Sequence, residues 1–221
     1  GLNPGNTFAP TFDPEYIDSI EVGTKNTLLD NRMQLNAAAF YYDYSDYQSF
    51  SWVNNAGVVT NEEASFSGVE LEVFLTPTDS LDVIVNFSYT DAVVEDLEVA
   101  SGYFADTTPP FTPEYQASAM LRYNWDAFDG NMAAQLSANY QSETFHNARN
   151  FTAHEIDSYA TADTRLTWVD AEDKWLIAAY VDNLFDSDHE LIGFDVTGFY
   201  GTSQISYAKP RTYGVTVRRN F

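Results

Sequence analysis

The chain has 221 residues, with 33 Asp and Glu against 10 Lys and Arg and a formal net charge of −23. Binding to nucleic-acid phosphates requires clustered basic residues, so this charge argues against nucleic acid as a partner. The absence of cysteine excludes thiolate metal sites, disulfides and a thiol nucleophile. The 16% aromatic content argues against disorder, because disordered chains are poor in aromatic residues.

The first part of the chain predicts two strands after an opening loop at residues 1–13. A polar strand is expected from residue 16 to about 28, and a long aromatic strand from residue 32 to about 47. The tight turn between them falls at residues 29–31. Residues 48–62 are then expected to form a loop.

The clearest alternation runs through residues 64–75. Leu71 and Val73 share one face, whereas Glu70 and Glu72 share the other. Because successive side chains of a strand point to opposite faces, this pattern predicts a strand with one apolar and one polar face.

The same rhythm continues to the end of the chain. Further strands are predicted at residues 81–90, 115–125, 132–141, 160–168, 175–183 and 210–221. Short turns alternate with long loops, and the long loops are predicted at residues 48–62, 93–113, 145–157 and 185–208. The result is about nine strands of roughly 10–14 residues, longer than the five or six residues usual in globular sheets.

The last strand ends on an aromatic residue, which needs an apolar surround. Its apolar face carries Tyr213, Val215, Val217 and Phe221 and is interrupted only by Arg219. Its polar face carries Thr212, Gly214, Thr216, Arg218 and Asn220.

Three features indicate an antiparallel up-and-down transmembrane β-barrel. Strands of about ten alternating residues suit a tilted barrel wall in a membrane, and short turns with long loops are typical of its two rims. Aromatic residues mark the ends of the apolar stripes, as in interfacial girdles: Phe87, Tyr89, Tyr123, Trp125, Tyr140, Trp168, Trp175, Tyr213 and Phe221. The polar face would point into a wet or plugged lumen with Glu70, Glu72, Asp82, Arg122, Gln135, Asp163, Arg165 and Arg218.

Two other architectures remain open on these patterns. A soluble β-barrel or β-sandwich that binds a ligand would place the apolar face inside and the polar face outside. A small self-contained porin-like barrel would require an even number of strands, whereas about nine are predicted. An odd number fits a chain that is the C-terminal part of something longer.

Five segments carry motifs that are specific when taken in order. Residues 14–25 follow the pattern P-E-x-x-x-x-x-E-x-G-x-K, residues 29–44 form the next hairpin, and residues 68–72 read G-x-E-x-E. Residues 181–186 contain N-L-F-D, and residues 210–221 form an aromatic-ended terminal strand. At this spacing they resemble the C-terminal barrel region of the TonB-dependent outer-membrane receptors.

The resemblance implies a plugged barrel of about 22 strands, of which residues 1–221 would supply the C-terminal segment. It implies the outer membrane of a Gram-negative bacterium, contact with membrane lipid and lipopolysaccharide, and energy coupling to the TonB complex through a plug that this sequence lacks. The imported ligand would be a small molecule or metal chelate, most readily a ferric siderophore, with haem, a saccharide or cobalamin as alternatives. The barrel-assembly machinery would read the terminal strand through Tyr213, Gly214, Val215, Val217 and Phe221.

Candidate ligand contacts lie in the predicted long loops. Imidazole can ligate or contact a metal chelate, and exposed aromatic rings can stack on a ligand. The candidates are Trp52, Tyr103, Phe104, His146, His154, His189, Phe194 and Tyr200. No hydrolase triad order, phosphate-binding loop or metalloprotease motif occurs, so neither an enzyme nor a bound cofactor or metal ion is expected.

Overall fold

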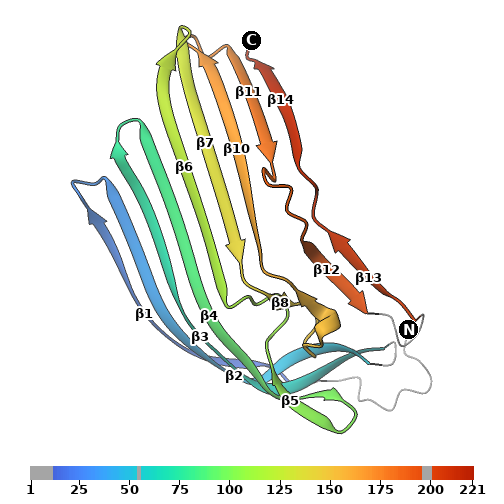
Figure 1. Ribbon diagram of the computed structural model, residues 1–221. Coiled ribbons are helices and arrows are strands. Elements are labelled where there is room, and N and C mark those ends of the chain that lie inside the picture. The colour runs from blue at the N-terminus through green and yellow to red at the C-terminus, as the bar shows by residue number, and fades with distance from the viewer. Residues whose placement is uncertain (1–11, 54–55, 196–200) are drawn as a thin grey trace.

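The computed structural model describes residues 12–53, 56–195 and 201–221. Its main antiparallel sheet has 10 strands, of which nine follow one another in the order β1-β2-β3-β4-β6-β7-β10-β11-β14, while β5 pairs with β4 (Figure 1). We call this nine-strand sheet the wall. Among the described residues, no helix is long and apolar enough to cross a membrane.

The wall strands confirm the predicted strand order. They are β1 (Tyr16–Leu28), β2 (Met33–Val53), β3 (Ala56–Thr78), β4 (Leu81–Ala100), β6 (Tyr115–Ala127), β7 (Gly130–Gln141), β10 (Tyr159–Asp170), β11 (Trp175–Asp182) and β14 (Thr212–Arg219). The remaining elements are β5 (Tyr103–Thr107), β8 (Thr144–Phe145), the 3-10 turn η1 (Thr152–His154), β9 (Glu155–Ile156), β12 (Glu190–Asp195) and β13 (Ser203–Tyr207).

Tight turns connect the strands at one end of the wall, which we call the short-turn end. Between β6 and β7 the turn consists of Phe128 and Asp129, with φ angles of 56° and 51°. Positive φ at both central residues is the geometry whose twist matches a two-residue hairpin. The opposite end, where the connections are long, is the loop end.

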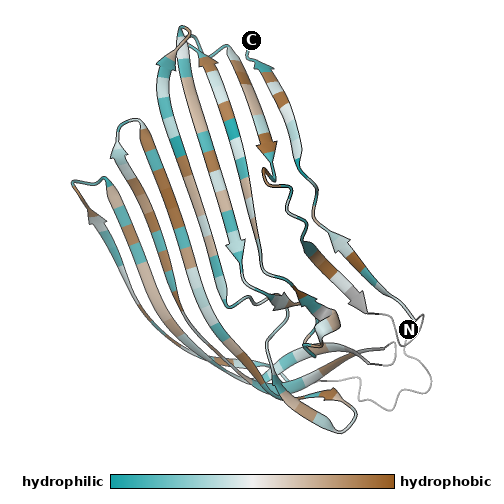
Figure 2. Ribbon diagram, in the orientation of Figure 1, coloured by the Kyte–Doolittle hydropathy of each residue, from teal (hydrophilic) through white to brown (hydrophobic). Residues whose placement is uncertain are grey.

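Strand register places the apolar residues of neighbouring strands in common rows. Leu71 pairs with Phe87, Phe87 with Ala117, and Ala117 with Tyr140. Hydrophilic and hydrophobic residues alternate along the strands in Figure 2. The period-two pattern of each strand therefore adds up to one continuous apolar face.

The other face of the wall is polar. Glu72 pairs with Asn86, Asn86 with Ser118, and Ser118 with Asn139. The register also confirms that the predicted polar-face residues share this side: Glu70, Glu72, Asp82, Arg122, Gln135, Asp163, Arg165 and Arg218.

The predicted long loops were wrong in their local structure. β2 has 21 residues and β3 has 23, so these paired strands include residues 48–53 and 56–62, which were expected to be part of a loop. Likewise β4 and β5 form a hairpin within residues 93–113. Regular alternation fades beyond the apolar band because these strand ends pack against one another.

The other two predicted loops also contain paired strands. β8 begins one residue before the loop predicted at 145–157 and pairs with β9 inside it, and β12 pairs with β13 within residues 185–208. Figure 1 shows the β12–β13 hairpin beyond the loop end of β11 and β14. These pairs are too short and irregular for an alternation pattern to reveal them.

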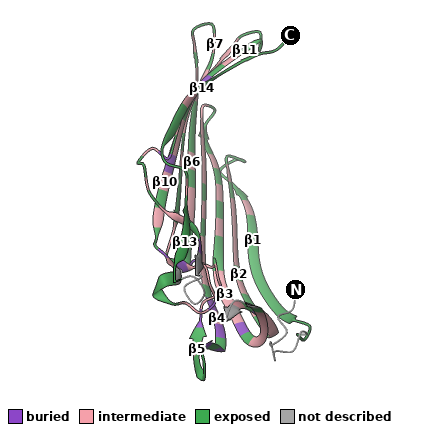
Figure 3. Cartoon of the chain, turned by 90° about the vertical axis from the view of Figure 1, so that its right-hand side faces the viewer, coloured by how far each residue is buried: buried purple, intermediate pink, exposed green. Residues whose placement is uncertain are grey.

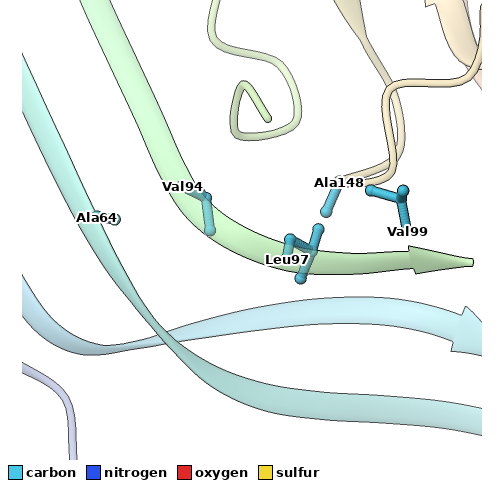
Figure 4. Close-up of a cluster of buried hydrophobic side chains, with 5 residues drawn as sticks. All are labelled: Ala64, Val94, Leu97, Val99 and Ala148. Atoms are coloured by element: carbon cyan, nitrogen blue, oxygen red, sulfur yellow. The ribbon is translucent and has the colours of Figure 1, made fainter. Parts of the chain in front are cut away.

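The compact core of this chain lies at the loop end of the wall, where β3 and β4 extend past the apolar band and meet Ala148. Its buried members are Ala64, Val94, Leu97, Val99 and Ala148, drawn together in Figure 4. Val94 is 0% exposed, whereas most wall residues are exposed or intermediate (Figure 3). A single-layer sheet has no second layer to cover it, so the larger buried side chains lie where hairpins fold together, while the buried residues of the middle wall strands are the small Ala133, Ala162 and Ala178.

Candidate functional site

A groove of about 410 Å³ runs along the polar face of the wall across β3, β4, β6, β7 and β10. Polar side chains dominate its lining: Glu70, Glu72, Asn86, Ser88, Gln116, Ser118, Asn139, Gln141 and Tyr159. Within the described part of the chain, no lysine, arginine or histidine lines it. The groove therefore offers amide and hydroxyl groups for hydrogen bonding, together with two carboxylates.

A second groove of about 410 Å³ adjoins the first, and Glu70 and Glu72 line both. It adds Lys25 and Asn36 from β1 and β2. The Asn36 side-chain amide donates a hydrogen bond to the Glu72 carboxylate over 3.1 Å, which fixes that carboxylate at the boundary of the two grooves.

Hydrogen bonds between strands hold the lining groups in place. The Tyr159 hydroxyl donates to Oε1 of Gln141 at 3.0 Å, and the Asn86 amide donates to the Ser118 hydroxyl at 3.0 Å. Each of these amide groups retains further hydrogen-bonding capacity. The lining is thus an ordered set of donors and acceptors suited to a polar ligand.

Two stacked aromatic rings lie on the polar face, between the grooves and the loop end. The rings of Phe40 and Tyr42 stack with centroids 4.9 Å apart on the polar face of β2. Gly68 makes room for them, because a Cβ there would lie 2.6 Å from the Phe40 ring and 2.2 Å from the Tyr89 carbonyl oxygen. Sequence reasoning missed this pair, since aromatic residues occupy both faces of β2 here and hide its alternation.

Tyr103 and Phe104 lie on β5 and are 65% and 57% exposed. As neighbours on one strand they point to opposite sides, so they do not form a single ligand surface. Their roles as ligand contacts stay a prediction.

Two of the predicted histidines pack against other parts of the loop end. A Cβ on Gly193 of β12 would lie 2.2 Å from the His146 ring, so this imidazole fills the space above a glycine. The ring of His189 stacks on Tyr159 with centroids 3.9 Å apart. The geometry thus links His189 to the rim of the polar groove through Tyr159.

The remaining predicted contacts are not placed by the structure. Tyr200 and the side chains of Trp52, His154 and Phe194 lie outside the described residues. In the described part of the chain, no group of three or more His, Asp or Glu side chains could hold a metal ion.

One titratable pair stands out on the β12–β13 hairpin. The Tyr207 hydroxyl donates a hydrogen bond to the Glu190 carboxylate over 3.3 Å. The negative charge of Glu190 raises the pKa of Tyr207 from its ordinary value, so this phenol stays protonated and keeps donating to the carboxylate. The bond fastens the two strands at the base of the hairpin.

The family described as "TonB dependent receptor-like, beta-barrel" matches residues 1–184. The chain belongs to the TonB-dependent receptor family. The pesticin receptor of Yersinia pestis is 29% identical over 216 residues, which cover 96% of this chain and 30% of that protein. The metal-pseudopaline receptor CntO of Pseudomonas aeruginosa is 28% identical over 176 residues, covering 79% of this chain and 24% of that protein.

A solved structure shows the same fold. The ferric yersiniabactin uptake receptor FyuA of Yersinia pestis superposes with a TM-score of 0.77 at 24% identity, over 95% of this chain and 30% of that receptor. The chain therefore spans about 30% of the relatives' length and forms part of a larger receptor barrel. The relatives are receptors rather than enzymes, and a soluble ligand-binding module is not favoured.

Membership of this outer-membrane family assigns the two faces of the wall. The apolar face meets lipid, and the polar face with its grooves meets the lumen. Aromatic residues lie at both ends of the lipid-facing band: Tyr89 and Tyr115 toward the loop end, and Tyr123 and Trp125 toward the short-turn end. Tyr89, Tyr123 and Trp125 are among the residues predicted to form the girdles, and Tyr115 is an addition that the structure pairs with Tyr89.

The terminal strand of the receptor segment lies at one edge of the wall. β14 pairs with β11, so that Val215 lies opposite Ala179 and Val217 opposite Ile177. Tyr213, Val215 and Val217 are 80%, 68% and 61% exposed and share the lipid side. This placement agrees with the predicted faces, while recognition of the strand by the assembly machinery stays a prediction.

Proposed function

We propose that the intact receptor imports a metal chelate, most readily a ferric siderophore, across the outer membrane by energy-coupled transport. Residues 1–221 would be the C-terminal segment of its barrel. The carrying observation is that the chain shares its family with relatives named for pesticin and for metal-pseudopaline, which it matches over 96% and 79% of its length.

The chemistry of the lumen-facing side of the wall supports the proposal of a polar cargo. Its groove presents amide and hydroxyl groups beside Glu70 and Glu72, and the stacked Phe40 and Tyr42 rings lie further toward the loop end. Hydrogen-bonding groups and aromatic rings together suit a chelate with polar arms and flat ring systems. The carboxylates disfavour a strongly anionic chelate at this wall.

Two partners belong to this proposal. The TonB complex would supply energy through a plug in the remainder of the receptor. The barrel-assembly machinery would fold the barrel by reading the terminal strand.

Uptake by cells tests the proposal. A Gram-negative strain lacking its own siderophore receptors would express the intact receptor, with and without a functional TonB. We expect accumulation of radioactive iron from at least one of a panel of hydroxamate, catecholate and phenolate chelates, and only with TonB. Accumulation of labelled cobalamin or oligosaccharide, with none of the iron chelates, would contradict the cargo assignment.

A further inference from the structure

Arg219 is the one basic residue on the lipid-facing rows of the described strands. Lys25, Arg122, Arg165 and Arg218 all lie on the lumen-facing rows. The other basic residues lie in turns and loops. A cation on a lipid face is costly unless it sits at the interface and finds a partner, so this exception requires a reason.

Two aromatic rings lie close to this cation. Arg219 lies opposite Trp175 in the β11–β14 register. Its guanidinium carbon is 5.0 Å from the ring centroid of Trp175 and 5.0 Å from that of Phe221. Cation–π contacts use the face of the guanidinium, so its N–H groups remain able to donate at the edge.

The backbone next to Arg219 is hydrogen-bonded to the adjacent turn through Asn220. The Asn220 backbone N–H donates to the Lys174 carbonyl at 2.8 Å, and the Asn220 side-chain amide donates to the Asp173 carbonyl at 2.8 Å. The residue between Arg219 and Phe221 is therefore tied to the turn that follows β10.

The Arg219 guanidinium has no protein acceptor within the residues that the structure describes. Arg122 and Arg165, by contrast, donate to the neighbouring Asn124 and Thr167 side chains. The closest basic neighbour in the turn, Lys174, is occupied by an ion pair with Glu172. Arg219 thus presents N–H donors that have no acceptor among the described residues. They lie at the short-turn end, which in this family of barrels faces the periplasm.

We propose that Arg219, which lies beside the rings of Trp175 and Phe221, binds the phosphate group of a phospholipid in the periplasmic leaflet. A guanidinium matches a phosphate with parallel charge-assisted hydrogen bonds, and aromatic girdles lie at the depth of the headgroups. Deeper in the same lipid-facing rows, Ile177 and Val217 lie opposite each other and supply an apolar track for an acyl chain. This inference is independent of the receptor's cargo.

Native mass spectrometry of the intact receptor tests the site. The receptor is titrated with palmitoyl-oleoyl phosphatidylglycerol, with the diacylglycerol that carries the same chains, and with inorganic phosphate as competitor. We expect Arg219→Gln to weaken phosphatidylglycerol binding about fivefold, from the contribution of one basic residue at a membrane surface. Diacylglycerol binding should not change.

Three matched variants distinguish lipid binding at Arg219 from general effects of changing the charge or the stability of the receptor. Arg219→Lys keeps the charge but loses the paired hydrogen bonds and the flat guanidinium face, so it should bind less tightly than the parent and more tightly than Arg219→Gln; this also covers the case in which the glutamine variant assembles poorly. Trp175→Leu keeps the cation but removes one ring, and should weaken binding about two- to fivefold. Arg122→Gln removes a lumen-facing arginine and should leave binding unchanged.

Equal phosphatidylglycerol binding by the parent and Arg219→Gln would overturn the proposal, as would diacylglycerol binding as tight as phosphatidylglycerol. Complete displacement by inorganic phosphate would overturn the lipid assignment, because the acyl track would then contribute nothing. Selective retention of lipid A over phosphatidylglycerol would place the site in the wrong leaflet.

Discussion

The wall and the loop end of this chain remove their apolar side chains from water in opposite ways. The wall is one layer thick, and its apolar rows, such as Leu71–Phe87–Ala117, face outward. The loop end folds hairpins together and buries Leu97 to 3% exposure. The membrane acts as the apolar solvent for the wall, whereas the loop end stands in water and must build its own core.

The largest expected effect comes from placing a charge in the apolar rows of the wall. Leu71→Arg should destabilise the receptor in a bilayer by about 2–4 kcal/mol, because arginine near the midplane is poorly solvated. Ser88→Arg places the same side chain on the lumen face beside the same rows and should cost far less. Urea unfolding in vesicles measures both, and equal costs would mean that the two faces have been assigned wrongly.

A core substitution at the loop end tests the other half of the comparison. Leu97→Ala should cost about 2 kcal/mol locally, because it removes buried methyl groups and leaves a cavity. Hydrogen exchange should show faster opening of β5 and of the part of β4 beyond the apolar band, with the rest of the wall unchanged. Phe104→Ala, at a 57% exposed position, is the control. Faster exchange throughout the wall would show that the two regions are not separate.

The glycine beneath the aromatic pair lies where the two regions meet. Gly68→Ala should cost about 1–3 kcal/mol, because its Cβ would overlap the Tyr89 carbonyl and the Phe40 ring. Near-ultraviolet circular dichroism should report the displaced rings. Ser67→Ala, one residue away and on the lipid face, should change neither signal. An unaltered spectrum for Gly68→Ala would show that the strand relaxes around the added methyl group.

Much of the wall could be predicted from the sequence because its period-two pattern repeats in every strand. Glu70 and Leu71 reveal their faces by alternation alone, and the register then carries that assignment to neighbouring strands. The same rule failed for residues 48–53 and 56–62. There β2 and β3 continue past the apolar band, and their polar and apolar side chains no longer separate onto two faces.

The candidate site was less predictable than the wall. The Phe40–Tyr42 pair depends on Gly68 from the next strand, and the His189–Tyr159 stack joins segments far apart in the chain. Contacts of this kind arise from tertiary packing, which a local residue pattern does not encode. The grooves, by contrast, follow from polar positions that alternation had already placed on one face.

A smaller loss of stability is expected when one hydrogen bond in the lining of the polar groove is removed. Tyr159→Phe removes the hydrogen bond to Gln141 and should cost about 0.5–1.5 kcal/mol of stability. Because the His189 ring can still stack on phenylalanine, the loop-end contact should persist. Thermal unfolding of the intact receptor measures the change, and a loss well above this range would show that the hydroxyl supports more than one contact.

The smallest effect is a pH dependence at the loop end. Burial raises the pKa of Glu62, with a further contribution from Asp96, while a hydrogen bond from Thr60 opposes the shift. A raised folded-state pKa means that the stabilising contribution is complete at acidic pH and is lost as pH rises through that pKa. Glu62→Gln should therefore resist proteolysis better than the parent at about pH 8 but not at acidic pH. Equal resistance at both pH values would contradict this assignment.

The most direct test of the two-faced wall uses cysteine labelling at adjacent positions. This segment has no native cysteine, so Leu71→Cys and Glu72→Cys can be introduced separately into a cysteine-free version of the intact receptor in its membrane. A water-soluble maleimide and a lipid-phase probe report which solvent each thiol meets. We expect Glu72→Cys to react only with the water-soluble reagent and Leu71→Cys only with the lipid-phase probe. The reverse pattern, or equal labelling of both positions, would contradict the account.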